Sequence, residues 1–380
     1  MNKQENGSVL VLMAGLIIVL TGFAVLAVDV GRIYIVRNEL QNAADSAALA
    51  GANCLIRQSL DGSTTECTSI NATALNWTRA SAKAVAQLGN NSAANFAIST
   101  TGTGHQVDVG YWDVNGGTAL QPPTFTPLGP CTVGAGGGMT TACHKPAVRV
   151  EITKDTGKNN GPITMLTAAM FGGANVPMTA RAVAVISSPG NVPPLSLIPQ
   201  VINKCMYDRF WNAATGSPII FTSADVDPFG LSVVGQPWKL RIGSAYHYGT
   251  CASGQWTTFA QDLNSQSAVG NLITNGNPTP LAIGDQTWIQ PGTKTASYND
   301  LDAKFPSPPG ADVSIIVVDT TNLTNKGQAT IVAFAGFHID DIQGGSQKFM
   351  QGHFIANFIT PGSGGIGPFY GTYTPPRLAQ

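Results

Sequence analysis

The sequence predicts an α+β fold in which one long N-terminal helix crosses a membrane and packs on a small α+β domain, followed by a β-rich C-terminal domain. Three observations support this fold class: a charge-free apolar run near the start, a helical pattern that continues beyond it, and short alternating segments with many turn residues in the second half. The expected divisions are a short N-terminal segment, a membrane helix, an α+β domain and a β-rich domain, at 1–8, 9–28, 29–187 and 188–380.

The composition allows large cores but little surface charge. Of the 380 residues, 43% are hydrophobic and 11% are charged, against roughly 25% charged residues in an average soluble protein. The net charge of -1 offers no excess of Lys and Arg with which to displace counterions from nucleic acid. We therefore expect no nucleic-acid partner.

The run from Val9 to Val28 contains 20 residues without a charge. At about 1.5 Å per residue such a helix spans roughly the 30 Å of a bilayer core. A cleaved signal peptide is the competing interpretation, with Lys3 before the run and Val25 and Ala27 at suitable positions for cleavage. The run is longer than the roughly 7 to 15 apolar residues of a signal peptide, so we expect an uncleaved anchor.

The helical pattern continues after the membrane segment, because apolar residues such as Ile33 and Leu40 recur at three- and four-residue steps. The two segments together predict one helix of about 50 residues. Small residues recur every four positions at Ala43, Ala47 and Gly51, and small side chains allow another backbone to approach closely. Two interpretations of this helix packing face remain open: packing on the same domain, or contact with another subunit.

The elements that follow are read in order along the chain. A helix over Asn71–Leu88 is expected to end at Gly89 in a left-handed cap. We then expect strands and one short apolar helix, at His105–Val114, Ala147–Thr153, Ile163–Gly172 (the helix) and Asn175–Ser187.

The second half of the chain begins after a stretch rich in proline and glycine, Ser187–Leu195, which predicts a linker. Beyond it the sequence predicts short strands joined by turns, with one short helix around Ser267–Ile273. This pattern is typical of a β-rich domain.

Six cysteines suit an oxidising compartment, and none has the C-x-x-C spacing of a zinc or redox site. Neighbouring cysteines in the sequence suggest three disulfides, although spacing alone does not choose among the possible connectivities. The candidate pairs are Cys54 with Cys67, Cys131 with Cys143, and Cys205 with Cys251. Disulfides would place most of the chain outside the cytoplasm.

The sequence contains no nucleophile elbow, zinc-protease or phosphate-loop pattern. His338 and Asp340 alternate onto one face of a predicted strand, and Asp225 and Asp227 offer carboxylate oxygens. A solvated strand end and an Asp-Pro turn explain these two groups more simply. We therefore expect no catalytic residue, no cofactor and no metal site, and a protein that is not an enzyme.

One long segment directly after the membrane run, AVDVGRIYIVRNELQNAADSAALAGA, resembles the N-terminal signature of TadG-like proteins of the Flp, or tight adherence (Tad), pilus-assembly system. The matching positions include Asp29, Gly31, Arg32, Gln41 and the run that ends at Ala52. A segment of the second half, LAIGDQTWIQPG at 281–292, resembles the same family more loosely.

The resemblance implies a membrane-anchored subunit with a pilin-like helix, related to type IV pili, that acts in pilus assembly and surface adhesion through protein packing. It implies a single pass through the inner membrane, residues 1–8 in the cytoplasm and the bulk of the chain in the periplasm. The implied partners are the inner membrane, other pilus-assembly proteins and pseudopilin-like subunits. The alternative is a secreted or surface adhesin with a carbohydrate or metal site in the β-rich domain.

Overall fold

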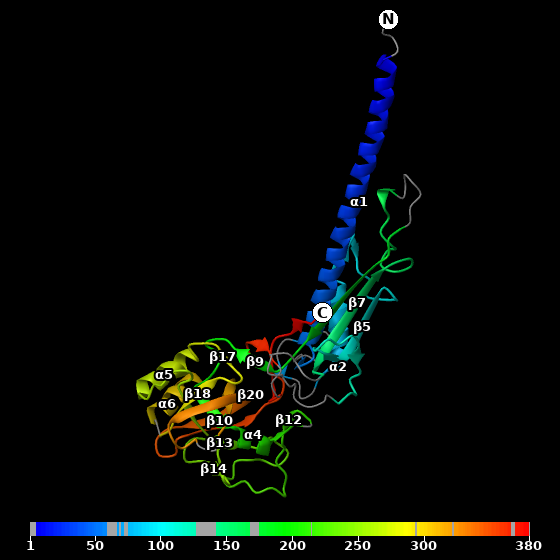
Figure 1. Ribbon diagram of the computed structural model, residues 1–380. Coiled ribbons are helices and arrows are strands. Elements are labelled where there is room, and N and C mark those ends of the chain that lie inside the picture. The colour runs from blue at the N-terminus through cyan, green and yellow to red at the C-terminus, as the bar shows by residue number, and fades with distance from the viewer. Residues whose placement is uncertain are drawn as a thin grey trace.

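The molecule is elongated, and its N-terminal helix projects from one end (Figure 1). The computed structural model describes residues 5–58, 67, 70–71, 75–126, 142–167, 175–213, 215–292, 295–320, 323–365 and 369–379. An α+β domain packs against the second half of the helix, and a β-rich domain lies farthest from the N-terminus (Figure 1). The predicted fold class is confirmed.

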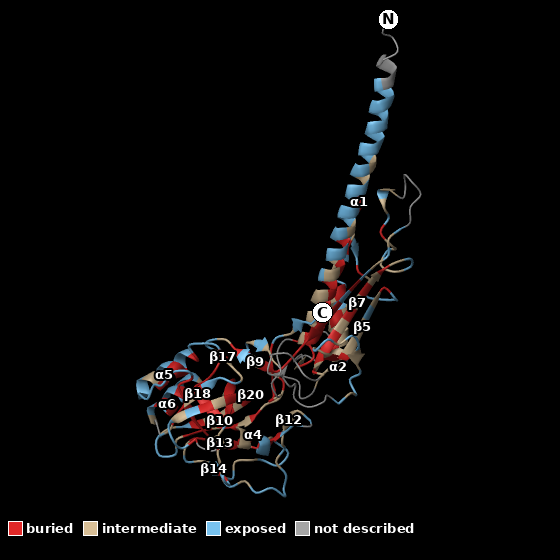
Figure 2. Ribbon diagram, viewed as in Figure 1, coloured by how far each residue is buried: buried red, intermediate tan, exposed pale blue. Residues whose placement is uncertain are grey.

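Helix α1 (Glu5–Asn53) is continuous over 49 residues, which confirms the predicted length. No proline interrupts it, and proline is the residue that most strongly breaks a helix. Figure 2 shows that its first half is exposed and that its second half is buried along one side. Buried positions begin at Asp29 and recur regularly from Val36 onward.

The first domain is built on an antiparallel sheet in the order β25-β8-β7-β5-β6. Helices α1 and α2 pack together, and both contact this sheet. The elements besides α1 are β1 (Arg57–Gln58), β2 (Ile70–Asn71), α2 (Trp77–Leu88), β3 (Ser92–Ala93), β4 (Phe96–Ala97), β5 (His105–Asp113), β6 (Leu120–Gln121), β7 (His144–Lys154), β8 (Met178–Val185) and β25 (Arg377–Leu378).

Several predictions for this domain need correction. Helix α2 begins at Trp77, because the side chain of Asn76 accepts a hydrogen bond from the backbone N–H of Arg79 and caps the helix there. Gly89 has φ -62°, a right-handed conformation, so the predicted left-handed cap is wrong. Ile163 pairs with Val176 in an antiparallel bridge.

The short helix predicted over residues 163–172 therefore begins later than expected. Of its described residues, 163–167, only 166 and 167 are helical. Residues 168–174 lie outside the described part of the chain.

The second domain contains a sheet in the order β13-β21-β20-β18-β16-β10-β19 in which β19 also pairs with β20. This extra pairing closes five of the strands into a ring, and β21 and β13 extend from it. The strands are β10 (Gln200–Asn203), β13 (Leu240–Ile242), β16 (Gly254–Thr257), β18 (Gln286–Gln290), β19 (Ala311–Asp319), β20 (Gly327–Gln343) and β21 (Phe349–Phe354).

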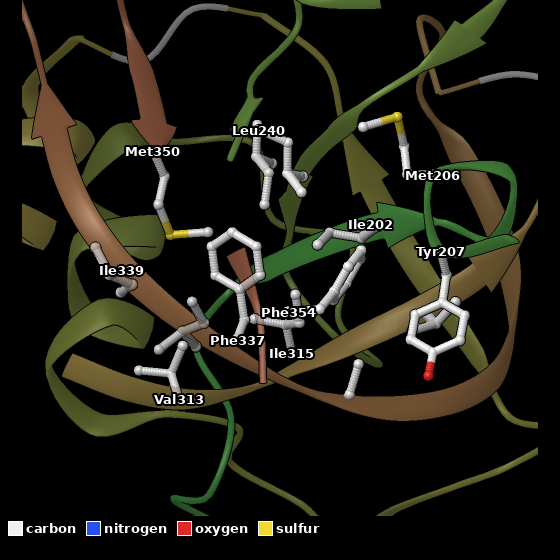
Figure 3. Packing of buried hydrophobic residues seen from close by; sticks show 14 of the residues in the cluster. Ile202, Met206, Tyr207, Leu240, Val313, Ile315, Phe337, Ile339, Met350 and Phe354 are labelled. Atoms are coloured by element: carbon white, nitrogen blue, oxygen red, sulfur yellow. The ribbon is translucent and has the colours of Figure 1, made fainter. Parts of the chain in front are cut away.

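Alternation along these strands divides the core of the domain into two clusters. Val201 and Ile316 belong to one cluster, while their chain neighbours Ile202 and Ile315 belong to the other. Figure 3 shows the larger cluster, in which aromatic and aliphatic side chains from several strands pack around Phe337. Apolar side chains pack on both sides of the strands of this closed ring. The second domain therefore has its own hydrophobic core.

Short elements surround the ring. Helix α5 (Gln266–Asn275) confirms the helix predicted near Ser267, but the sequence pattern missed two further helices. The remaining elements are β9 (Pro189–Val192), α4 (Lys204–Phe210), β11 (Trp211–Asn212), β12 (Ser217–Pro218), β14 (His247–Tyr248), β15 (Cys251–Ala252), β17 (Leu281–Ala282), α6 (Thr295–Lys304), β22 (Phe358–Ile359), β23 (Ser363–Gly364) and β24 (Thr372–Tyr373).

The stretch predicted as a linker, residues 187–195, is ordered and paired. Strand β9 lies within it and joins β17 and β23 in a small sheet. Pro189 tolerates this position because the strand is short and its pairing with Gly364 is irregular. The junction between the domains is therefore a structured element.

The C-terminal segment, residues 369–379, returns from the second domain to the first. The side-chain hydroxyl of Thr372 donates to the carbonyl of Phe334 in the second domain at 2.7 Å. Tyr373 is 7% exposed within the core of the first domain, and β25 then adds to the edge of β8. The last strand of the chain thus belongs to the first domain's sheet.

We expect Tyr373→Ala to destabilise the first domain by about 3 kcal/mol, because it leaves a cavity where a large buried aromatic ring packed. The substitution Leu378→Ala is the matched control, since Leu378 is 42% exposed. The two variants are compared by urea unfolding monitored separately for each domain. Equal midpoints for the two variants would contradict the packing described here.

Candidate functional site

The most distinctive polar contact joins the end of the apolar run to a distant part of the chain. Asp29 lies one position beyond Val28, yet its side chain is only 1% exposed. Its carboxylate accepts hydrogen bonds from the backbone N–H of Leu166 at 2.7 Å and of Thr167 at 2.8 Å, and from the Thr167 hydroxyl at 2.7 Å. We call this group the membrane-exit contact.

The membrane-exit contact satisfies a charge that would otherwise be costly to bury. Hydrogen bonds to an ionised carboxylate are stronger than those between neutral groups. The two backbone donors stand at the start of a helical turn at 166–167, where N–H groups lack partners within the helix. Asp29 therefore caps that turn and holds the β7–β8 connection against α1. Figure 1 shows this connection extending along the helix toward the N-terminus.

Further polar side chains of α1, C-terminal to Asp29, bind the rest of the first domain. Glu39 accepts from the backbone N–H of Ala94 at 2.8 Å, and Gln41 donates to the carbonyl of Arg181 at 3.0 Å. Asn91 donates to the hydroxyl of Ser46 at 3.2 Å. Glu39 and Ser46 are two turns apart on one side of the helix and Gln41 lies on the other, so these contacts fix the rotation of the helix within the domain.

The small residues Ala43, Ala47 and Gly51 are buried in their own domain. A Cβ atom added to Gly51 would lie 2.8 Å from the carbonyl oxygen of Ala80 and 3.0 Å from a methyl group of Val148. The face therefore packs on α2 and the sheet. With no exposed surface at Ala43 or Ala47, the alternative interpretation, a contact with another subunit through these residues, is not supported by this structure.

Disulfides reinforce both domains. Cys54 and Cys67 are bonded, with their Cα atoms 5.2 Å apart, directly after α1 ends. Cys205 and Cys251 are bonded with a Cα separation of 6.1 Å, joining α4 to β15. Cys143 is also disulfide-bonded, and Cys131 lies outside the described residues.

A second polar group, the His–Asp cluster, lies on the large sheet of the second domain. Strand pairing places Asp312, His338 and His353 side by side across β19, β20 and β21. The Nδ1 atom of His338 lies 2.6 Å from Asp312, and that of His353 lies 3.0 Å from Asp340. Lys239 completes the cluster with its ammonium group 3.3 Å from Asp340.

The charges of this cluster support one another. The hydrogen bond with Asp312 raises the pKa of His338 above its usual value, against the opposing effect of burial. Burial alone would raise the pKa of Asp340, but the His353 hydrogen bond and the nearby Lys239 outweigh it, so this pKa is lowered. Across the described residues, no group of three or more His, Cys, Asp and Glu side chains is arranged to hold a metal ion.

Asp225 and Asp227 act as structural acceptors in an exposed loop. Asp227 receives backbone N–H bonds from Phe229, Leu231 and Ser232 at 2.7 to 2.9 Å. Burial tends to raise its pKa, but these donors lower it overall. The loop carries exposed valines at its surface: Val226, Val233 and Val234.

Sequence reasoning grouped some of these residues correctly and missed others. It quoted Asp29 and Gln41 as parts of a signature but assigned them no contacts. It also paired His338 with Asp340 without finding Asp312, Lys239 or His353. These partners are fixed by strand register between distant segments, for which a single sequence carries no direct signal.

The fold defines a class of protein in which one helix is apolar and exposed over its first half and forms the core of an α+β domain over its second half. The chain matches two family models, described as putative Flp pilus-assembly TadE/G-like over residues 7–53 and putative Tad-like Flp pilus-assembly over residues 62–184. These two matches support a relationship to Tad-like pilus-assembly proteins. No curated protein and no solved structure gives a significant match.

The matched ranges together cover α1 and most of the first domain. They include the membrane-exit contact at both of its ends. The looser resemblance noted at 281–292 lies beyond these ranges and stays a prediction.

The substitutions Gly51→Ala and Gly31→Ala form a matched pair, because both replace glycine within α1. In each case the helix gains about 1 kcal/mol of intrinsic propensity. Gly31 has no atom within 4 Å of the added Cβ, whereas Gly51 has backbone at 2.8 Å. We expect a net loss of about 1 kcal/mol or more only for Gly51→Ala, through overpacking.

Thermal unfolding of the first domain in detergent measures this difference. A similar rise in both midpoints would show that the helix interface at Gly51 is looser than the structure indicates.

The His–Asp cluster predicts a pH dependence of the second domain. The raised pKa of His338 means that its contribution to stability is complete below the unfolded value near 6.5 and is lost as the pH rises through the folded value. Urea midpoints measured across this interval should therefore fall for the native protein. The urea midpoints should change less with pH for Asp312→Asn, which lacks the charge that stabilises the His338 imidazolium. The same pH dependence in both proteins would contradict this role of Asp312.

Proposed function

We propose that the chain is a non-enzymatic, single-pass subunit of an Flp/Tad-type pilus, anchored in the inner membrane with its two domains in the periplasm. It acts in pilus assembly and in surface adhesion, through packing against other pilus components. The division of α1 into an exposed apolar half and a buried half is the observation that carries this proposal.

The exposed half of α1 requires a nonaqueous environment. Large apolar side chains such as Leu10, Leu12 and Ile18 are 70 to 73% exposed there, and a stretch of such residues is a poor surface for a soluble monomer. The helix is long and apolar enough to cross a membrane, with a mean hydropathy of 2.9 in its most apolar window. A bilayer satisfies these side chains directly.

The disulfides in the two domains support a location of these domains outside the cytoplasm. Disulfides persist in oxidising compartments, and the described pairs lie in both domains, at Cys54–Cys67 and Cys205–Cys251. This supports a periplasmic location for the residues after the membrane helix. Residues 1–8 then lie on the cytoplasmic side.

A packing role fits the way the polar groups are used. The carboxylates of Asp29 and Asp227 are engaged by backbone donors, and His338 and His353 are engaged by carboxylates. A catalytic site needs a nucleophile or acid left available to a substrate. We assign adhesion to the second domain, whose exposed loop displays Val226, Val233 and Val234.

Membrane extraction of the protein from cells tests the anchor. We expect a full-length chain that stays in the membrane pellet after alkaline washing and enters the detergent phase. The substitution Leu16→Arg should release it, because a charge at the centre of a bilayer is costly, by about 3 kcal/mol on insertion scales. A soluble protein shortened up to Ala27 would instead establish the secreted adhesin.

Deletion of the gene then tests the pilus role, with the full chain and a Val226→Ser, Val233→Ser, Val234→Ser variant reintroduced for comparison. We expect pili to disappear on deletion and to return with both versions, with surface attachment reduced only in the triple variant. Normal pili in the deletion strain would refute a role in assembly.

A further inference from the structure

Exposed apolar surface continues on α1 beyond the charge-free run. Past Asp29, the helix exposes Tyr34 by 61% and Ile35 by 58%, and Val30 by 42%. From the β7–β8 connection, Leu166 adds a side chain that is 44% exposed. We call this group, which is completed by Val28 and Arg32 and extends around more than one side of the helix, the exit surface.

The length of the apolar stretch agrees with more than a bilayer core. From Val9 to Ile35 the helix covers 27 residues, or about 40 Å. A hydrocarbon core is roughly 30 Å thick, and a bilayer with its headgroup regions is roughly 40 to 45 Å. With Val9–Val28 in the core, Tyr34 and Ile35 lie about 9 to 10 Å beyond its edge, at the outer limit of a headgroup region that is roughly 5 to 8 Å thick on each side.

The membrane-exit contact places the backbone of Leu166 at the level of Asp29, about 8 Å closer to the core than Tyr34 along the helix. The Leu166 backbone N–H is 2.7 Å from the Asp29 carboxylate, so this part of the β7–β8 connection cannot lie far from the first turn after the core. Asp29 and Leu166 are 137 positions apart in sequence, and their contact therefore depends on the folded first domain. The surface therefore combines two chain segments, one near the inner limit of the headgroup region and one near its outer limit.

The chemistry of the exit surface fits a layer of anionic lipid headgroups. Tyrosine is enriched at this depth because its ring is apolar and its hydroxyl is polar. The exposed side chains of Arg32 and Arg37 can extend to phosphates, and basic residues near an anionic surface are attracted to it. The surface is also continuous with the membrane helix itself.

We propose that the exit surface is a second membrane contact, in which Leu166 and Tyr34 enter the headgroup layer of a bilayer containing anionic lipid. The membrane-exit contact positions Leu166 for this role. Two contacts at different points on one rigid domain fix the depth and rotation of the helix, and so the direction in which the domains extend. This inference rests on the proposed membrane anchor.

Labelling at three positions in full-length protein tests the proposal. Single cysteines at Leu16→Cys, Leu166→Cys and Val226→Cys carry an environment-sensitive NBD dye, in vesicles of phosphatidylethanolamine and phosphatidylglycerol. The unmodified chain, treated with the same dye, is the control for labelling of native cysteines. Flotation establishes that each protein is inserted, and iodide and headgroup spin-labelled lipid serve as quenchers.

We expect the dye at position 166 to be quenched by the spin-labelled lipid and protected from iodide, with a blue shift relative to the dye at 226. Adding Asp29→Ala should abolish that protection while flotation and the signal at 16 stay unchanged. Protection in vesicles of phosphatidylcholine alone should be weaker, since the arginines then lack an anionic partner.

Other outcomes separate this proposal from the anchor. Iodide quenching at 166 equal to that at 226, with position 16 still in lipid, would overturn the second contact and leave the anchor intact. Protection at 166 from both quenchers would indicate a protein contact, such as a second copy of the chain, and would also overturn it. A dye at 16 open to iodide would remove the anchor itself.

Discussion

One continuous helix has to satisfy two environments, and the rest of the structure depends on how that conflict is resolved. Over its first half α1 exposes large aliphatic side chains, which suits lipid, whereas over its second half it buries residues as small as alanine and glycine. Small residues let α2 and the sheet approach the helix axis closely. The transition occurs within a few turns, between Asp29 and Val36, and places a folded domain directly beside the exposed apolar half of the helix.

The close packing explains why polar residues of α1 can act at long range in the sequence. Asp29, Glu39 and Gln41 each bind backbone groups from other parts of the domain. These contacts need a correctly folded sheet, and the sheet in turn needs the buried half of the helix as its core. The helix and the sheet therefore form one cooperative unit, and a substitution on the buried face of α1 should also destabilise the sheet.

The sequence predicted the features that depend on local pattern, such as the long helix, the strands β5, β7 and β8 and the helix α5. It failed where distant segments decide the outcome. Residues 187–195 were predicted to link two domains and do lie at the junction, but their prolines gave no sign of the strand that pairs with β17 and β23. The partners of His338 and Asp29 were likewise invisible, since register and loop placement are set by tertiary packing rather than by propensity.

The C-terminal segment gives the two domains a physical connection at both sides of their junction. The chain leaves the first domain after β8 and returns to pair with the edge of the same strand through β25. Between these points Tyr373 fills the first core and Thr372 binds the second domain. A force on the second domain is thereby divided between two strands of one sheet, and that sheet packs on the buried half of α1. The second domain is linked to α1 through packed structure on both sides of the junction, and this connection is what the proposed packing role requires.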